Sequence, residues 1–215
     1  MGIKTYLKIK RVMDIIMAII LLILFALPML LVVALIKLDD GGPVLYKQSR
    51  MGKGLKPFNM YKFRTMRSDR KEFESLLTHE EMVTRVGKFL RATSIDELPQ
   101  LINILKGDMS FVGPRPWILD YYKVFTEEQK RRCDVLPGLS GLAQLKGRNG
   151  INIMQKIEYD LEYVRTASLK LDLKIFILSI IEVTSRNNAE ISEIGIKKEL
   201  SELKKLNELK GKCIW

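Results

Sequence analysis

The chain has 215 residues, with 36 Lys and Arg against 25 Asp and Glu, so its formal net charge is +11. The mean hydropathy is +0.02, and 47% of the residues are hydrophobic. These values exclude a polytopic membrane protein, a disordered chain and a collagen-like fibre. They leave a basic domain of ordinary composition that carries one strongly apolar segment.

The apolar segment covers residues 15–36 and is interrupted only by Pro28. As one helix it would measure about 33 Å, which just matches a hydrocarbon core of about 30 Å. Cations flank both ends: Lys4, Lys8, Lys10 and Arg11 precede it, and Lys37, Lys47, Arg50, Lys53 and Lys56 follow it. The positive-inside rule draws both ends to the cytoplasmic face, which a straight span cannot satisfy.

Pro28 predicts a break in this helix, because proline removes a backbone hydrogen bond and clashes with the preceding turn. We therefore expect a re-entrant membrane helix over residues 1–38. It would enter and leave on the cytoplasmic face, with its cations on anionic lipid headgroups. A kinked helix that spans the membrane once is the alternative.

Short strands and then helices follow this segment. Residues 44–50 and 58–63 flank the turn sequence MGKGLKP, which is typical of a β-hairpin. Residues 69–91 are charged and favour helix. The next helix is predicted to start with a capping box of Ser94 and Glu97 and to end at Gly107.

The remaining segments alternate between restricted loops and helices. The sequences at 111–117 and 136–150 are rich in Gly and Pro and predict ordered loops. Residues 152–166 and 169–183 favour helices, and the second is apolar enough for the core or the membrane interface. Leucines at helical spacing over residues 196–212 predict a surface helix or a contact with a partner.

The overall expectation is an α+β fold dominated by helices, with a small β-hairpin and amphipathic helices at the membrane interface. We divide it into a membrane segment at 1–38, a catalytic domain at 39–185 and an amphipathic tail at 186–215.

The small number and the wide spacing of the cysteine and histidine residues give no indication of a zinc site or a disulfide framework. Cys133 and Cys213 are too few and too far apart for a disulfide framework, and no Cys/His cluster has zinc-ligand spacing. A reducing compartment is the simpler interpretation. The one histidine, His79, lies in a charged stretch, where a solvated position is expected before a catalytic one.

Several cations lie beside glycine, proline or a predicted helix end, where they suit phosphate groups. They are Lys62, Arg64, Arg67, Arg91, Arg115 and Arg148. Solvated cations that face anionic lipid are an equal alternative for any one of them. A nucleic-acid partner is not expected, because no groove-reading module or RNA-binding aromatic signature occurs.

Asp96 and Glu97 form an adjacent acidic pair close to Arg91. Acids in the first turn of a helix complement its dipole, and Glu97 would complete the capping box. The functional alternative is a carboxylate nucleophile or Mg²⁺ ligand beside phosphate-binding cations. Spacing by itself does not separate the two interpretations.

Three motifs then occur in one order behind the apolar segment: YKFRTM (61–66), SIDELPQLINILKGDMSFVGPRP (94–116) and PGLSGLAQLKGRN (137–149). Together they closely resemble the bacterial sugar transferases known as monotopic phosphoglycosyl transferases. The resemblance runs from about residue 9 to about residue 185 and is to the small members, which consist of the catalytic domain.

The resemblance implies a reaction at the cytoplasmic face of the bacterial inner membrane. Members transfer a sugar phosphate from a UDP-sugar to polyprenol (undecaprenyl) phosphate, release UMP and require Mg²⁺. This is the first membrane step of surface glycan assembly. Two alternatives remain at this stage: a non-catalytic membrane scaffold for a glycan pathway, and a transferase with a different nucleotide donor. A homo-oligomer and contacts with other glycosyltransferases of the pathway stay open.

The resemblance also implies a role for each site residue. Asp96 would attack the phosphorus that bears the sugar and form a covalent intermediate, and Asp96 and Glu97 would hold Mg²⁺. The residues that would bind phosphates or the nucleotide, or face the site, are Lys62, Arg91, Arg115, Arg148 and Asp160. Members break the membrane helix at a Ser-Pro pair, whereas Leu27 precedes Pro28 here.

Overall fold

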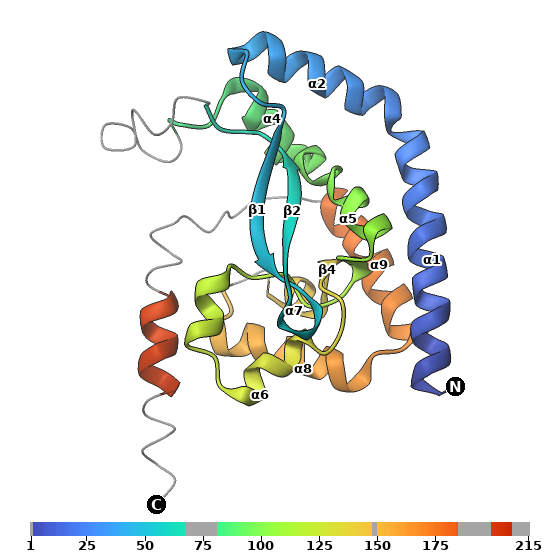
Figure 1. Cartoon of the computed structure of the whole chain (residues 1–215), viewed down its shortest axis with the longest axis vertical. Coiled ribbons are helices and arrows are strands. Elements are labelled where there is room, and N and C mark those ends of the chain that lie inside the picture. Colours follow the sequence, from blue (N-terminus) through green and yellow to red (C-terminus); the bar gives the residue numbers. More distant parts are fainter. Residues whose placement is uncertain (1, 68–80, 148–149, 185–198, 208–215) are drawn as a thin grey trace, which may run out of the picture.

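The computed structural model describes residues 2–67, 81–147, 150–184 and 199–207, which form a helical domain with a long bent arm along one side (Figure 1). The helices are α1 (Ile3–Leu24), α2 (Ala26–Asp40), α4 (Arg85–Thr93), α5 (Gln100–Lys106), α6 (Glu127–Lys130), α7 (Leu142–Lys146), α8 (Ile153–Thr166), α9 (Leu169–Thr184) and one at residues 199–207. The strands are β1 (Leu45–Met51), β2 (Pro57–Phe63), β3 (Ser110–Val112) and β4 (Gly138–Ser140). The expectation of a helix-dominated fold with a small sheet is confirmed.

The apolar segment forms α1 and α2, which meet at Phe25 with a bend of 61°. The break predicted at Pro28 is therefore misplaced by three residues. Pro28 is the third residue of α2, where a missing N–H is tolerated. The bend precedes it because the proline ring would collide with the carbonyl four residues earlier, at Leu24, where α1 ends.

Among the described residues, no single helix has both the length and the apolarity to cross a membrane. The bent pair of α1 and α2 meets the criterion together, by length and composition only.

One stripe of α1 is fastened to the domain by polar contacts. Tyr6 Oη and Lys10 Nζ donate to Asp172 Oδ2 in α9 at 2.8 and 2.7 Å. Arg11 donates to two carbonyl oxygens in the last turn of α5, and Asp14 Oδ1 accepts a bond from the backbone of β3. Residues 6, 10 and 14 are one helical turn apart, so one face of α1 carries these bonds.

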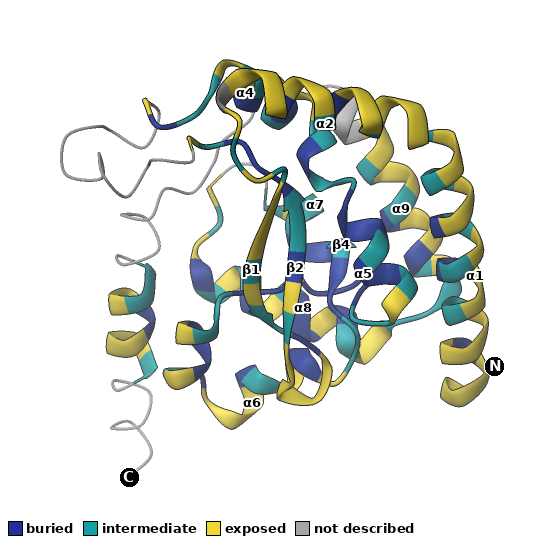
Figure 2. Cartoon of the chain, turned by 45° about the horizontal axis from the view of Figure 1, so that its top comes forward, coloured by how far each residue is buried: buried dark blue, intermediate teal, exposed yellow. Residues whose placement is uncertain are grey.

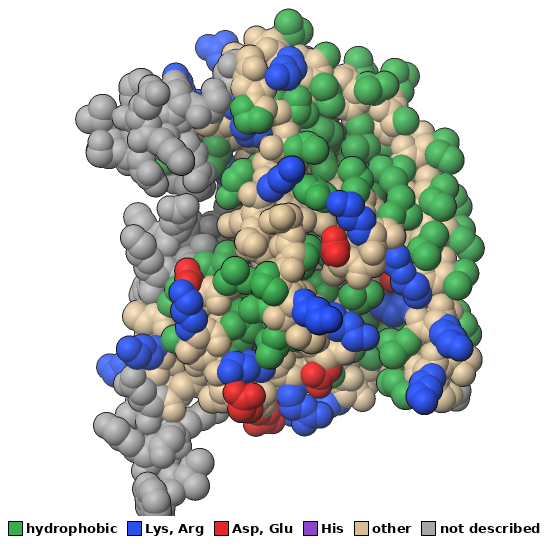
Figure 3. Space-filling model, viewed as in Figure 1, with side chains coloured by type: hydrophobic (Ala, Val, Ile, Leu, Met, Phe, Trp, Pro, Cys, Tyr) green, Lys and Arg blue, Asp and Glu red, His purple; other side chains and the backbone are tan. Residues whose placement is uncertain are grey.

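The outer faces of α1, α2 and α9 are apolar and exposed. Figure 2 shows the outer faces of α1 and α2 as exposed, and Figure 3 shows hydrophobic side chains over both helices. The exposed side chains include Val12, Ile16, Ile20, Ile23 and Leu24 of α1, Leu27, Leu30, Leu31 and Leu38 of α2, and Leu173, Ile177 and Ile181 of α9. Exposed apolar side chains in this number are typical of a surface that contacts a protein, a ligand or a membrane.

The predicted β-hairpin is confirmed, with strands β1 and β2 paired antiparallel from Leu45 opposite Phe63 to Met51 opposite Pro57. Its turn contains Gly54 in the left-handed region at φ 63°, a conformation that glycine adopts without steric cost. Met60 and Lys62 share one face of β2, since side chains alternate along a strand. Met60 packs into the main core beside Leu101 and Ile104 of α5, so Lys62 is carried toward the same part of the molecule.

The main core lies where α1, α5, α9 and the parallel pair β3 and β4 meet. A second cluster joins aromatic residues 117–125 to α8 and to the helix at 199–207. The helices predicted at 152–166 and 169–183 are confirmed as α8 and α9. Of the charged stretch 69–91, residues 69–80 with His79 lie outside the described residues, and α4 begins at Arg85. The β3–β4 pairing was not predicted, because each strand has only three residues.

Candidate active site

Asp96 and Glu97 lie on a tight turn between two helices. The helix α4 stops because Ser94 takes a left-handed conformation at φ 57°. A single 3₁₀ turn over Ile95–Glu97 follows, and Pro99 leads into α5. The predicted capping box is therefore wrong: the Ser94 side chain makes no capping bond. The predicted end of this helix at Gly107 is confirmed by its left-handed φ of 87°.

Lys62 of β2 lies close to both carboxylates. Its Nζ lies 2.7 Å from Glu97 Oε1 and 3.7 Å from Asp96 Oδ2. The side chain of Asp96 is 11% exposed and that of Glu97 is 23% exposed, so both ion pairs are shielded from bulk water. Glu97 thus faces a cation from another element, which favours the functional interpretation of the pair.

Arg115 reaches the same site from the loop after β3. Its Nη2 lies 4.0 Å from Glu97 Oε1, and its side chain is half exposed. The loop lies close to the segment before β4 at Gly113, where a Cβ would collide with the carbonyl oxygen of Leu136. Only glycine allows this approach, which fixes the position from which Arg115 projects.

Arg91 lies in the last turn of α4, and its Nε donates to Thr65 Oγ1 at 2.9 Å. Thr65 lies in the same motif as Lys62, and its backbone packs directly against Gly87 of α4. Arg91 is therefore attached to the end of β2, on the side of α4. Arg148, the remaining predicted phosphate ligand, lies outside the described residues.

Asp160 of α8 is buried beneath the site and does not contact the Asp96–Glu97 pair through any bond that the structure describes. It is 1% exposed and accepts a bond from Arg132 Nε at 3.0 Å. Burial raises the pKa of the Asp160 carboxyl, while the positive charge of Arg132 acts to lower it. Burial also opposes the charge on Arg132, but the attraction of Asp160 outweighs it and keeps the pKa of that guanidinium raised.

Arg132 connects this buried pair to the Arg115 loop. Its Nη2 donates to the backbone oxygen of Arg115 at 2.6 Å, its Nη1 donates to Tyr122 Oη at 2.7 Å, and it lies 4.5 Å from the Trp117 ring. Asp160 is therefore linked to the Arg115 loop through Arg132 and a backbone carbonyl. Arg132 was not predicted as a functional residue. The one sequence feature that could have indicated it is its position, five residues before the Pro-Gly that begins the third motif.

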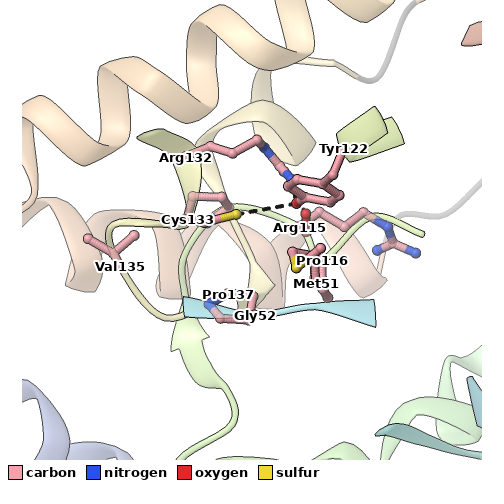
Figure 4. Close-up of a pocket in the computed structure, with 10 residues that line it drawn as sticks. Met51, Gly52, Arg115, Pro116, Tyr122, Arg132, Cys133, Val135 and Pro137 are labelled. Atoms are coloured by element: carbon pink, nitrogen blue, oxygen red, sulfur yellow. Dashed lines mark hydrogen bonds between the residues drawn. The ribbon is translucent and has the colours of Figure 1, made fainter. Parts of the chain in front are cut away.

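A small pocket lies beside the Arg115 loop (Figure 4). Its lining comes from the end of β1, the Arg115 loop, the 3₁₀ segment at 119–123 and the segment before β4. The lining residues are Met51, Gly52, Pro114, Arg115, Pro116, Tyr122, Arg132, Cys133, Val135 and Pro137. Cys133 Sγ is 3.4 Å from Tyr122 Oη, and burial raises the pKa of its thiol, so it is held as the protonated and unreactive form.

The two carboxylates fit a Mg²⁺ site in which the substrate supplies some of the ligands. Protein Mg²⁺ sites commonly use one or two carboxylates, with water and substrate phosphates as the other ligands. Within the described ranges, no cluster of three or more His, Cys, Asp or Glu side chains offers an all-protein site. Two adjacent carboxylates with Lys62 against both and Arg115 against Glu97 are a set of groups suited to chemistry on phosphate groups.

Comparison with known proteins agrees with this class. Residues 5–186 match the bacterial sugar transferase family. The chain is 47% identical over 174 residues to an uncharacterized sugar transferase, EpsL, of Bacillus subtilis. The aligned region covers 81% of this chain and 86% of the relative. It is 46% identical over 191 residues to the UDP-glucose:undecaprenyl-phosphate glucose-1-phosphate transferase of Caulobacter vibrioides, which covers 84% of this chain and 71% of the relative.

A third relative, the exopolysaccharide production protein PSS of Rhizobium leguminosarum, is 37% identical over 194 residues, which covers 84% of this chain and 97% of the relative. The chain therefore belongs to the bacterial sugar transferase family, and the resemblance found in its motifs is confirmed. The expectation of a transferase enzyme is confirmed with it, against the alternative of a non-catalytic scaffold.

Proposed function

We propose that this protein transfers a sugar 1-phosphate from a UDP-sugar to polyprenol phosphate, with UMP as the second product. The observation that carries the proposal is the convergence of Lys62 and Arg115 on Glu97, with Lys62 also 3.7 Å from Asp96. Relatives whose names give UDP-glucose and undecaprenyl phosphate as substrates support the same substrate classes.

The chemistry divides into two phosphoryl transfers at Asp96. A carboxylate oxygen of Asp96 attacks the phosphorus that bears the sugar, and the bond from that phosphorus to the UMP oxygen breaks. UMP leaves with the bonding electron pair. A phosphate oxygen of the polyprenol phosphate then attacks the same phosphorus, and the bond to Asp96 breaks, which restores the carboxylate. A covalent intermediate lets UMP leave before the lipid enters.

The neighbouring residues hold charge during both steps. Lys62 lies against both carboxylates and keeps Asp96 oriented, and Arg115 offers its half-exposed guanidinium to a phosphate group. Mg²⁺, held by Asp96 and Glu97 together with substrate phosphates, would neutralise part of the phosphate charge when bound. Arg91 and Arg148 stay proposed as further phosphate ligands.

The bent arm supports a place at the membrane surface. We propose that α1 and α2 form the re-entrant anchor and that the exposed apolar faces of α1, α2 and α9 contact lipid. The inward stripe of α1 is tied to the domain through Lys10 and Asp172, which supports an arm that rests on the catalytic domain. The polyprenol tail would then stay in lipid while the nucleotide sugar arrives from the cytoplasm.

The test is a panel of nucleotide sugars, each incubated with the full chain, polyprenol phosphate and Mg²⁺ in nanodiscs. Release of UMP with formation of a polyprenyl-diphosphate sugar from at least one UDP-sugar is expected. Release of a different nucleotide would support the rival donor, and no release from any donor would contradict the proposal.

A further inference from the structure

Two guanidinium groups hold consecutive carbonyl oxygens of the Arg115 loop. Arg132 Nη2 donates to Arg115 O at 2.6 Å, and Arg50 Nη1 donates to Pro116 O at 3.1 Å. Arg50 is in β1, and the next residue of that strand, Met51, donates its N–H to Trp117 O at 3.2 Å. The end of β1 is thus bonded to the loop, and Arg50 lies beside the side chain that points to Glu97.

The two arginines differ in how their charge is balanced. Arg132 is paired with Asp160 inside the protein, with side chains 2% and 1% exposed. Arg50 is half-buried, and its acceptors are the neutral oxygens Gln48 Oε1 and Pro116 O. In the part of the chain that the structure describes, it forms no ion pair with a carboxylate.

Arg50 is also close enough to Arg115 for the two charges to repel. Burial, and after it the charge of Arg115, lowers the pKa of Arg50 to about 10. A half-buried cation with neutral acceptors beside a second cation is unfavourable until an anion arrives. The guanidinium retains N–H groups beyond the three in its bonds to Gln48 and Pro116, because arginine has five donors.

We propose that Arg50 is a second phosphate-binding residue beside Arg115 and takes the phosphate that UDP-sugar and UMP share. This inference rests on the proposed function. It assigns Arg50 to the substrate, although its place in the sequence groups it with the cations that flank the membrane segment. Arg50 lies near the turn end of the hairpin, and Figure 1 shows that end as the one remote from α2. That position favours the nucleotide phosphate over the phosphate of the lipid acceptor.

The test compares UMP with uridine as competitive inhibitors in Arg50→Gln and the wild type. Loss of a charge-assisted contact should weaken UMP about tenfold or more. Uridine lacks the phosphate, so its inhibition constant should stay within about twofold. The KM for the UDP-sugar should rise with the UMP constant, while the KM for polyprenol phosphate should not change. Arg50→Lys keeps the positive charge but loses the planar pair of guanidinium donors. It should therefore weaken UMP binding by a smaller factor than Arg50→Gln does.

Arg131→Gln is the matched control, because it removes the same charge from a side chain that is 62% exposed on the surface. It should leave the ratio of the two inhibition constants unchanged. An unchanged ratio in both Arg50 variants would overturn the proposal. Equal weakening of UMP and uridine would make Arg50 a purely structural residue, and a raised KM for polyprenol phosphate alone would assign it to the acceptor. Wild-type protein that turns over no UDP-sugar would instead contradict the proposed function itself.

Discussion

Asp96 and Glu97 are chemically similar neighbours with different surroundings. The Asp96 side chain is largely shielded at 11% exposure and lies 3.7 Å from Lys62, while Glu97 holds the short bond to that lysine at 2.7 Å. Because Lys62 reaches both, it fixes the direction of the pair relative to β2. The tight turn after Ser94 places both carboxylates at the start of α5 without using either as a cap.

Asp96→Asn tests the nucleophile. The amide has the same shape but is a poor nucleophile, so UMP release should fall by roughly a thousandfold or more. The phosphosugar adduct that mass spectrometry should detect on wild-type protein with donor alone should be absent. Asp120→Asn removes an exposed carboxylate with 59% exposure and should behave as wild type. Undiminished turnover in Asp96→Asn would remove this residue as the nucleophile.

Glu97→Gln tests the metal ligand. A neutral amide is a weaker ligand for a hard cation, so the Mg²⁺ concentration for half-maximal activity should rise and the maximal rate should fall. A titration of activity against Mg²⁺ measures both. A fully active variant with an unchanged metal requirement would count against a ligand role for Glu97.

Asp160→Asn tests the buried anchor of the Arg115 loop. Removal of one partner leaves Arg132 charged and unpaired in the interior, so the free energy of unfolding should fall by about 3–5 kcal/mol. Denaturant unfolding in detergent micelles measures this difference. Asp134→Asn, at an exposed position next to the same segment, should change it by less than about 0.5 kcal/mol. Equal stabilities would show that the buried pair does not anchor the loop.

At the scale of elements, the helix at 199–207 packs on its own chain. Leu203 is 0% exposed within the aromatic cluster of residues 117–125. Glu199 accepts bonds from Tyr121 Oη at 2.9 Å and Lys156 Nζ at 2.7 Å. The sequence left this tail between a surface helix and a partner contact, and the structure shows an intramolecular contact with the segment that follows the Arg115 loop.

Leu203→Ala should undock this helix. Truncation of a buried leucine costs about 2–5 kcal/mol, which is large beside the stability of a single short helix. Hydrogen exchange measured by mass spectrometry should show faster exchange over residues 199–207. Leu206→Ala, at a position 40% exposed, should leave exchange close to wild type. The same exchange rates in both variants would contradict docking through Leu203.

At the scale of the whole molecule, exposed apolar side chains gather on the arm and on α9. The bend at Phe25 turns α2 across the top of α4, while α1 runs along α5 and α9 (Figure 1). Exposed apolar side chains on α1, α2 and α9 would lie in the acyl region, with the cationic N-terminal turn at the headgroups.

The re-entrant topology predicts that both ends of the arm react from the cytoplasmic side. Thr5→Cys and Asp39→Cys, each made in a chain whose own cysteines are replaced, should be labelled by an impermeant maleimide in inside-out vesicles only. Arg131→Cys in the catalytic domain provides the cytoplasmic reference. Labelling of Thr5→Cys from the periplasmic side would establish the kinked span instead.

The sequence by itself determined the family, the hairpin, the helices α8 and α9 and the approximate place of the bend. These features depend on local pattern, such as strand alternation, helical period and proline, which adjacent residues encode. The motifs also pointed to seven site residues, and the structure brings four of them together, namely Asp96, Glu97, Lys62 and Arg115. Arg91 and Asp160 have other partners, and Arg148 lies outside the described residues.

Only the tertiary structure decided what each charge faces. The Lys62–Glu97 contact joins residues 35 apart, and the contact of Arg50 with Pro116 joins residues 66 apart. A local pattern cannot show whether Glu97 caps a helix or pairs with a distant lysine. Nor can it show whether Asp160 is buried against another side chain or faces a substrate. Those outcomes depend on burial and on the energy of pairing charges away from water, which only the packed chain establishes.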